Sequence, residues 1–234
     1  MAPEPRRFHG RRLARPLTQR RKELIEHLLP RLRIALPEAG TLDPPLLDPT
    51  ALFVPPRKQV WLEIGFGGGE HLAWQAERHP EIGFVGCEPF LNGLASLLTM
   101  IDEKQLTNVR LHPDDARLLL ARLAPRSINR CFILFPDPWP KARHKKRRIV
   151  STETLDWLGE AMVDDAELRL ASDDGDYVEH MLEVTTAHPA FKPKRIGEES
   201  AARPEDWPPT RYEEKARAKG AACRFLIFER IPRN

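Results

Sequence analysis

The sequence predicts an α/β fold built on a parallel sheet that helices cover on both faces. Two observations lead to this prediction. From Val60 onward, short apolar runs alternate with longer amphipathic runs, and this alternation is typical of successive βαβ units. The chain has 234 residues, 41% of them hydrophobic, which is enough to bury one core. We therefore expect one α/β domain over residues 57–234.

Each expected element corresponds to one run of suitable length and period. The expected strands are residues 60–66, 83–89, 109–113, 128–135, 167–172 and 223–231. The expected helices between them are residues 70–79, 90–104, 115–123 and 176–187. Because ligands bind at the carboxyl ends of the strands in such sheets, the segments that follow the strands are where a site is expected.

The first 56 residues are expected to form a basic, proline-rich arm with one helix. Ten of the 23 prolines fall in this segment, so it cannot be one regular element. Thr18 is a suitable N-cap for a helix that runs to about Leu29, before Pro30. Residues 1–22 contain eight Arg and Lys side chains and a single acid, Glu4.

Positive charge is gathered locally in a chain whose formal net charge is only +3. Besides the N-terminal block, residues 143–148 read RHKKRR, and such patches most often meet phosphates. The three cysteines are far apart, so we expect buried, unpaired thiols. Because no apolar run reaches the length of a membrane span and no signal-peptide core is present, we expect a cytoplasmic protein that does not enter a membrane.

The glycine-rich stretch LEIGFGGGE, residues 62–70, lies where the first strand should end and a helix begin. Gly65, Gly67 and Gly69 can adopt positive φ and let a ligand approach the backbone closely. The dinucleotide fingerprint G-x-G-x-x-G would place its last glycine at Glu70, where a carboxylate opposes a pyrophosphate. The stretch instead resembles a loop for S-adenosylmethionine, a ligand without phosphates.

Acidic residues stand at or near the carboxyl ends of three successive expected strands. Glu63 can attract the cationic end of such a ligand, and Glu88, in the sequence GCEP, can accept hydrogen bonds from both ribose hydroxyls. Asp114 and Asp115 follow the third strand, where an adenine amino group could be recognised. One such acid alone would be a solvated loop residue, but three at successive strand ends favour a nucleoside site.

The stretch FILFPDPWPKARHKKRRIV, residues 132–150, joins a strand to a carboxylate between prolines, a Trp and a basic run. Its D-P-W-P is similar to the [DN]-P-P-[YFW] turn of many amino-methyltransferases. The prolines stiffen the turn so that Asp137 presents an acceptor oxygen, and Trp139 can stack on a planar base. Alone, the turn is a rigid surface feature and the run a solvated face. Together they favour a nucleoside pocket with a phosphate-binding rim.

These motifs resemble those of the bacterial tRNA (guanine-N7)-methyltransferases, the TrmB family, over nearly the whole chain. The matching stretches are FPDPWPKARHKKRR, LEIGFGGGEHL, GCEP, ASDDGDY and PPTRYEEKA. The resemblance implies a Rossmann-like class I S-adenosylmethionine-dependent methyltransferase fold, whose mostly parallel sheet has an antiparallel C-terminal strand and follows a basic N-terminal arm. It implies methyl transfer to N7 of guanine 46 in the tRNA variable loop, by a monomer or homodimer without an obligate protein partner.

The resemblance also implies roles for single residues. Glu63, Glu88 and Asp115 match cofactor contacts, and Asp137 matches the junction of cofactor and substrate. The positions that match substrate contacts are Lys141, Asp173, Thr210, Arg211, Tyr212 and Glu213. The positions that match the RNA-binding loop are Arg143, His144, Lys145, Lys146, Arg147 and Arg148. Because Asp174 stands where the family has an aromatic residue, either Asp173 or Asp174 can face the base.

The expected chemistry depends on positioning more than on proton transfer. Guanine N7 has an exposed lone pair, so no general base has to remove a proton before the attack. Positive charge moves onto the purine during transfer, and a carboxylate beside the base would stabilise it; Asp137 is the first candidate and Asp173 the second. Because N7 lies in the deep, narrow groove of A-form RNA, the target nucleotide should be unpaired or locally opened.

Three other functions are compatible with parts of the pattern. An NAD-linked oxidoreductase is disfavoured by Glu70, and a non-catalytic RNA-binding scaffold is disfavoured by the complete set of cofactor acids. A methyltransferase that acts on an exocyclic amine would be distinguished by base analysis of its product. His71, His112 and His144 lack metal-ligand spacing, so we expect no metal and solvated or helix-surface histidines.

Overall fold

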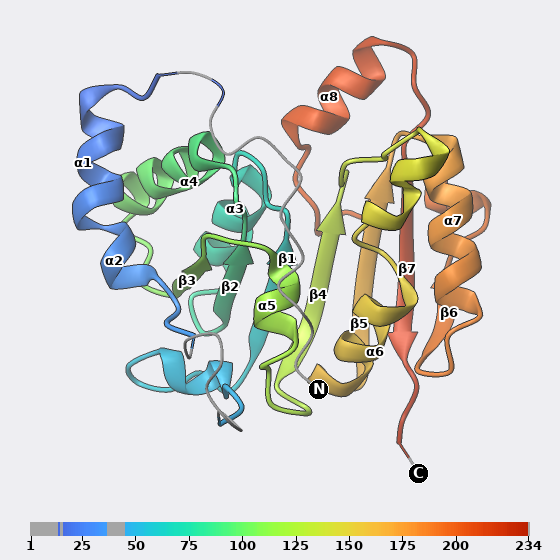
Figure 1. Ribbon diagram of the computed structural model, residues 1–234, viewed down its shortest axis with the longest axis horizontal. Coiled ribbons are helices and arrows are strands. Elements are labelled where there is room, and N and C mark those ends of the chain that lie inside the picture. Colours follow the sequence, from blue (N-terminus) through green and yellow to red (C-terminus); the bar gives the residue numbers. More distant parts are fainter. Residues whose placement is uncertain (1–13, 15, 37–44, 234) are drawn as a thin grey trace.

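The computed structural model describes residues 14, 16–36 and 45–233, and it places one seven-stranded sheet between two layers of helices (Figure 1). The strand order is β3-β2-β1-β4-β5-β7-β6. All neighbouring pairs from β3 to β5 are parallel. Strand β7 lies between β5 and β6 and is antiparallel to both. The predicted mostly parallel sheet with an antiparallel C-terminal strand is therefore confirmed.

All expected strands and helices are present, and the structure adds α6, β6 and α8, which the apolar pattern missed. The strands are β1 (Val60–Ile64), β2 (Gly83–Cys87), β3 (Val109–His112), β4 (Ile128–Leu134), β5 (Met162–Ser172), β6 (Phe191–Arg195) and β7 (Arg224–Arg230). The α-helices are α1 (Gln19–His27), α2 (Leu29–Leu32), α3 (Glu70–Arg78), α4 (Leu91–Lys104), α5 (Ala116–Leu120), α6 (Thr152–Ala161), α7 (Gly175–Thr186) and α8 (Arg211–Ala218). The 3-10 helices are η1 (Pro49–Leu52), η2 (Ala142–Arg147) and η3 (Glu198–Ala201).

Alternate residues of each strand point to opposite faces of the sheet, so each face has its own core. In β1, Val60 and Leu62 join the core beneath α5, α6 and α7. Trp61 points the other way and packs with Phe84 and Phe132 in the core beneath α2, α3 and α4. Glu63 shares the face of Trp61, which places its carboxylate on the α3 side of the sheet.

The N-terminal helix forms as expected from Gln19, and α1 packs against α4. Pro30 does not end the helical segment, because it lies in the first turn of the short α2, where its missing N–H is not needed. The Ile34 amide then donates to the Leu111 carbonyl at 2.8 Å, beside β3. Of the predicted arm, residues 1–13, 15 and 37–44 lie outside the described residues, and the boundary at residue 56 stays a prediction.

Two predictions from composition can be compared with the described residues. The three cysteines are buried and unpaired, as predicted. None of the described helices is both long enough and apolar enough to cross a membrane.

Candidate active site

A cavity of about 790 Å³ opens at the carboxyl ends of the strands, around the point between β1 and β4 where the strand order reverses direction. Twelve of the predicted site residues line it. They are Glu63, Gly65, Gly67, Glu88, Asp114, Asp115, Asp137, Trp139, Lys146, Arg147, Thr210 and Tyr212. The volume is in the range of small-molecule and cofactor sites.

The glycine loop forms the floor between β1 and α3, and two of its glycines are required by geometry. Gly67 has φ +55°, and a Cβ there would lie 3.1 Å from the Tyr212 ring. Gly69 has φ +82°, and a Cβ there would lie 2.7 Å from the Cβ of Leu97 in α4. Gly69 therefore does not line the cavity but lets the loop approach α4 closely. Glu70 begins α3 at the position where a dinucleotide would need its pyrophosphate.

The Glu88 carboxylate is buried at the end of β2 and holds the loop in place. Its oxygens accept hydrogen bonds from the Gly67 amide at 2.8 Å and the Phe90 amide at 3.0 Å. Burial raises the pKa of Glu88 to about 7, although these two amides and the like-charged Asp137 and Glu63 also act on it. A ligand that brings hydroxyl donors or positive charge to this carboxylate would offset the free-energy cost of ionising it in a buried place.

Two histidines expected at the surface are instead buried, which corrects the prediction. The His71 ring is 3% exposed, and its Nδ1 lies 2.7 Å from Glu63 Oε2. His112 is 5% exposed, and its Nε2 lies 3.2 Å from the Asp115 carbonyl. His71 is the second residue of α3, and its position on the inner face of that helix was the available sign. Within the described chain, no group of three or more acidic, His or Cys residues could hold a metal ion.

Asp115 is fixed between α5 and the basic loop, residues 141–148. Its carboxylate caps α5 by accepting from the Arg117 amide at 3.0 Å, and Arg117 Nη1 lies 3.2 Å from its other oxygen. The same guanidinium donates to the carbonyls of Arg147 and Arg148 at 3.3 Å. Arg117, which the sequence did not single out, therefore connects the third strand end to residues 141–148.

The Pro136–Trp139 turn follows β4 and carries Asp137 on the cavity wall. Phe135 and Trp139 both have positive φ, +50° and +47°, so the backbone is strained on each side of the turn. Enclosure by the walls raises the pKa of Asp137, although the residue is exposed to the cavity. The Trp139 ring faces the cavity, and the Arg147 guanidinium lies 5.1 Å from its centroid.

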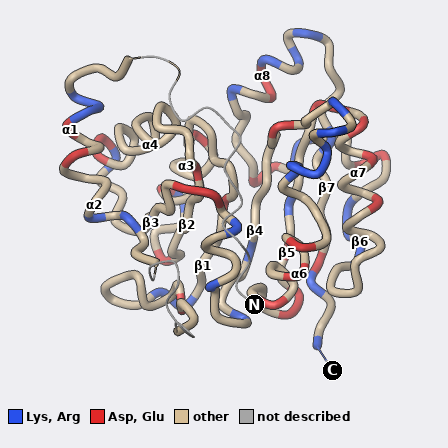
Figure 2. Tube along the Cα trace, in the orientation of Figure 1, with Lys and Arg blue, Asp and Glu red and all other residues tan. Residues whose placement is uncertain are grey.

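The basic loop, residues 141–148, contains η2 and lies beside the start of α7 (Figure 2). Lys146 and Arg147 line the cavity, while Lys141 and Arg143 are exposed outside it. Lys145 Nζ lies 2.7 Å from Asp176 at the start of α7, which holds the loop on that helix. The loop therefore presents positive charge both into the cavity and along its rim.

Arg148 is not accessible to RNA in this structure, which corrects its predicted place among the RNA contacts. Its side chain is 1% exposed and stacks on the Tyr177 ring, with the guanidinium carbon 4.6 Å from the centroid. Its Nε donates to the Pro138 carbonyl at 2.9 Å, and its Nη2 is hydrogen-bonded to Asp176. Arg148 thus fixes the Asp137 turn from behind.

The C-terminal segment closes one wall with Thr210 and Tyr212. Thr210 Oγ1 accepts from the Glu213 amide at 3.2 Å and caps α8, and the Tyr212 ring lies over Gly67. Arg211 lies outside the lining and pairs with Glu70 at 3.2 Å. Glu213 is 3% exposed and pairs with Arg217 Nε at 2.9 Å, so its carboxylate supports α8 rather than lining the cavity.

Helix capping indicates which of Asp173 and Asp174 is free to face the base. Asp174 accepts from the Tyr177 amide at 2.8 Å and is committed to the start of α7. Asp173 is exposed and does not line the cavity. A substrate contact by Asp173 therefore stays a prediction, and of the pair it is the carboxylate not used as the cap.

The cavity suits a cationic nucleoside better than a phosphate. Glu63, Glu88 and Asp137 line it together, and both neighbours raise the pKa of Glu88 by repulsion. S-adenosylmethionine carries a sulfonium and an amino group, whose positive charges these carboxylates would attract. It also carries ribose hydroxyls, from which the carboxylates could accept hydrogen bonds. The residues present therefore fit this cofactor.

The fold is that of class I S-adenosylmethionine-dependent methyltransferases. An rRNA methylase from Streptococcus thermophilus superposes with a TM-score of 0.51 at 12% identity, covering 74% of this chain and 87% of that one. A SAM-dependent O-methyltransferase from Thermotoga maritima gives a TM-score of 0.51 at 14% identity, covering 76% and 61%. A family model described as "Putative methyltransferase" matches residues 57–226. The class of protein is thus a methyltransferase.

Two curated relatives define the family more narrowly. The tRNA (guanine-N(7)-)-methyltransferase of Paramagnetospirillum magneticum is 49% identical, covering 99% of this chain and 96% of the relative. The tRNA (guanine-N(7)-)-methyltransferase of Rhodospirillum rubrum is 47% identical, covering 98% and 90%. The chain belongs to the tRNA (guanine-N7)-methyltransferase family, which confirms the resemblance found in the sequence.

Proposed function

We propose that this protein transfers the methyl group of S-adenosylmethionine to N7 of guanine 46 in the variable loop of tRNA, in the cytoplasm. The observation that carries the proposal is the position of Asp137. It lines the same cavity as the acids Glu63 and Glu88 and the basic residues Lys146 and Arg147. One cavity thus combines carboxylates that suit a cation with basic side chains that suit phosphates.

Bound S-adenosylmethionine supplies the electrophilic methyl group. Glu88 accepts hydrogen bonds from the ribose hydroxyls, and Glu63 attracts the amino acid end. Asp115, held by Arg117, orients the adenine edge. Tyr212 and the glycine loop enclose the ligand, because the tyrosine ring lies directly over Gly67.

Asp137 orients the guanine and stabilises the positive charge that develops on it. Its carboxylate accepts from the N1–H and amino group of the base, so N7 is turned toward the methyl group. Trp139 stacks on the base, and Arg147 holds the indole ring in place. No side chain has to accept a proton before attack, because the N7 lone pair is already free.

The tRNA backbone lies along the basic loop. Lys141, Arg143, Lys145, Lys146 and Arg147 offer phosphate contacts from the rim to the cavity, and His144 lies among them. Thr210 and Arg211 approach the substrate from the C-terminal segment, and Asp173 does so from the start of α7. The guanine enters unstacked, because N7 in a paired A-form helix is inaccessible to side chains.

The position of methylation tests the proposal. Two transcripts of one tRNA, with guanine or with adenine at position 46, are incubated with the protein and S-adenosylmethionine, then treated with borohydride and aniline, which cleave the chain at 7-methylguanosine. We expect cleavage at position 46 in the first transcript and none in the second. Cleavage at another guanine in both transcripts would overturn position 46 as the target. Transfer of a methyl group to the tRNA without any cleavage would overturn N7 as the acceptor atom.

A further inference from the structure

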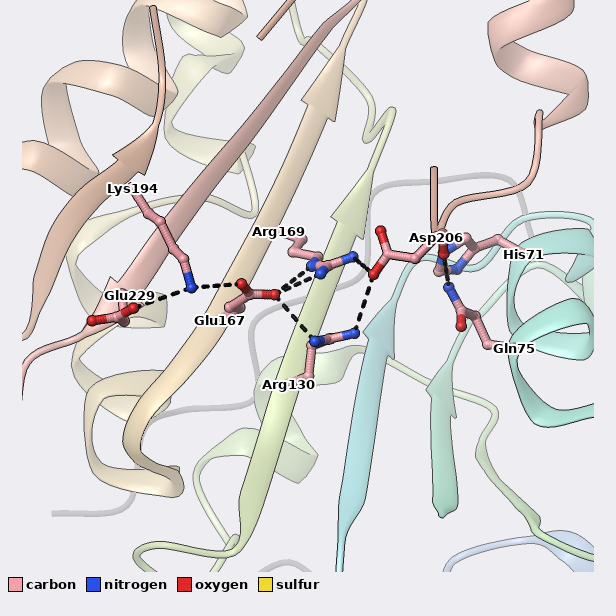
Figure 3. Close-up of polar contacts among 8 residues, drawn as sticks. All are labelled: His71, Gln75, Arg130, Glu167, Arg169, Lys194, Asp206 and Glu229. Atoms are coloured by element: carbon pink, nitrogen blue, oxygen red, sulfur yellow. Dashed lines mark hydrogen bonds and ion pairs between the residues drawn. The ribbon is translucent and has the colours of Figure 1, made fainter. Parts of the chain in front are cut away.

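A line of buried polar contacts connects Glu63, in the wall of the cavity, to the C-terminal segment at residue 206. Figure 3 shows the part of this line that joins His71, Gln75 and Asp206. Glu63 Oε2 lies 2.7 Å from His71 Nδ1, and His71 Nε2 lies 3.3 Å from Gln75 Nε2. The same Gln75 nitrogen donates to the carbonyl of Asp206 at 2.8 Å. None of the roles proposed above uses His71, Gln75 or Asp206.

The two partners of His71, Glu63 and Gln75, together determine which of its ring nitrogens carries the hydrogen. One N–H of the Gln75 amide points to the Asp206 carbonyl and the other to His71 Nε2, so Nε2 must accept. Nδ1 then carries the hydrogen and donates it to Glu63. Glu63, His71 and Gln75 are 5%, 3% and 1% exposed, so water does not compete for these groups. The Glu63 carboxylate is therefore oriented through His71 by a residue one turn further along α3.

Asp206 is itself held on the sheet by two arginines. Its Oδ2 lies 2.7 Å from Arg169 Nη1 of β5 and 3.5 Å from Arg130 Nη1 of β4. The next residue, Trp207, is 3% exposed and packs edge-on against His71, with ring centroids 6.1 Å apart. The segment is thus fixed at Asp206 and Trp207, immediately before the residues that close the cavity.

The arginines are fixed in turn by charges that cross the sheet. Glu167 accepts from Arg169 at 2.6 and 2.8 Å and from Lys194 at 2.9 Å. Burial opposes ionisation of Glu167, but hydrogen bonds from Lys194 and Arg169 lower its pKa to about 2. Lys194 also pairs with Glu229, which faces Glu167 across β5 and β7, so it neutralises two like charges in register. These contacts form a rigid base on which Asp206 rests.

We propose that His71 and Gln75 are positioning residues that couple the cofactor acid Glu63 to the C-terminal segment, through Asp206. A ligand that fixes Glu63 would then strengthen the attachment of residues 206–212, which the two arginines already hold on the sheet, and by reciprocity a more firmly attached segment would strengthen ligand binding. The inference rests on the proposed function only in naming S-adenosylmethionine as that ligand. Removing one neutral, buried link should weaken ligand binding up to about tenfold.

Hydrogen exchange of the full chain, with and without saturating S-adenosylmethionine, measures the coupling directly. The Trp207 amide, which donates to the Pro204 carbonyl, reports on the segment, and the Gly67 amide reports on the cavity floor. In the wild type we expect the ligand to slow exchange at both. In Gln75→Leu we expect protection at Gly67 only, together with the weaker binding. Ligand-induced protection of Trp207 in Gln75→Leu equal to that in the wild type would overturn the coupling.

Conservative variants separate the two ends of the histidine. In His71→Asn the side-chain amide falls near the position of Nδ1, so the donor to Glu63 is kept and the contact to Gln75 is lost. We expect His71→Asn to bind S-adenosylmethionine more tightly than His71→Leu, while both lose the response at Trp207. His188→Asn is the matched control, because His188 is a second buried histidine, 3.1 Å from a different acid, Asp156. A change of ligand binding in that control would show that the effects are not specific to His71.

The tautomer provides a readout that needs no ligand. Nitrogen NMR of the free wild-type chain should show His71 protonated at Nδ1 and unprotonated at Nε2. Gln75→Leu should keep this tautomer, because Glu63 still accepts from Nδ1, but the Nε2 resonance should shift since that nitrogen loses its donor. A hydrogen on Nε2 in the wild type would overturn the inference. A wild type that does not bind S-adenosylmethionine would overturn the proposed function and the coupling together. Binding without a response at Trp207 would overturn the coupling alone.

Discussion

The Glu88 carboxylate is costly to ionise in the folded chain, and replacing it measures that cost. Glu88 is 8% exposed, and burial raises its pKa from 4.5 to about 7. At 1.36 kcal/mol for each pH unit, ionised Glu88 lowers the free energy of unfolding by about 3 kcal/mol. Glu88→Gln removes this charge in the absence of ligand, but its side-chain NH2 group then faces one of the two backbone amides from which the carboxylate accepts, at a cost that does not depend on pH.

The pH dependence has a definite sign. The folded chain holds the Glu88 proton more tightly than the unfolded chain. The stabilisation that comes from binding this proton is therefore complete below pH 4.5, where both states are protonated. It is lost as pH rises toward 7, because the folded state must then release the proton into a site that disfavours the charge. We therefore expect the free energy of unfolding of Glu88→Gln, relative to the wild type, to be up to about 3 kcal/mol higher at pH 8 than near pH 4.5.

Urea unfolding of ligand-free wild type and variant at both pH values is the assay. Glu214→Gln is the control, because Glu214 is an exposed carboxylate on α8 and its replacement should leave both curves unchanged. The same Glu88→Gln should bind S-adenosylmethionine at least tenfold more weakly, since it loses charge-assisted hydrogen bonds. If the difference in free energy of unfolding between Glu88→Gln and the wild type is the same at both pH values, the electrostatic reasoning about the cavity is wrong.

Three further predictions test the turn, the basic loop and the cavity floor. Asp137→Asn should lower kcat on tRNA by about 10² to 10³ with S-adenosylmethionine affinity retained, measured by initial rates and calorimetry; a loss of ligand affinity with unchanged kcat would contradict the role. Lys146→Ala should reduce the slope of log tRNA affinity against log salt concentration by about 1, because it removes one phosphate contact. Arg148→Met should leave that slope unchanged and lower the free energy of unfolding by about 2 kcal/mol. A reduced slope in Arg148→Met with unchanged stability would restore Arg148 as an RNA contact. Gly93→Ala should weaken S-adenosylmethionine binding, because the added Cβ would lie 2.1 Å from the Gly67 carbonyl oxygen and displace the cavity floor. Gly175→Ala is the control, because a Cβ added there would meet no neighbouring atom within 4 Å. Calorimetry should show weaker binding for Gly93→Ala alone.

The sheet was predictable because its buried strands carry their own local signal. All five residues of β1 and of β2 are buried, and both follow from short apolar runs. Strand β6 reads FKPKR and lies at the edge of the sheet, where pairing on one side tolerates Pro193 and the lysines. Helix α8 buries only Glu213 and Ala216, so its sequence has no apolar stripe to recognise.

The site was predictable where position along a strand was sufficient. Glu63 lies near the end of β1, while Glu88 and Asp115 follow β2 and β3. The carboxyl ends of parallel strands meet in space. The roles of Arg148 and His71 depended on packing that no local pattern contains. In the run RHKKRR, only the docking of α7 determines that Arg148 is the buried cation, through Asp176 and Tyr177. Composition gives the same charge to every Arg and Lys of that loop.

Methyl transfer from labelled S-adenosylmethionine to unmodified tRNA, followed by nucleoside analysis, tests the central claim most directly. Wild type and Asp137→Asn are compared after calorimetry has shown that both bind the ligand. We predict label in 7-methylguanosine with the wild type and almost none with the variant. Label in a different nucleoside, or no label despite ligand binding by the wild type, would contradict the proposed function.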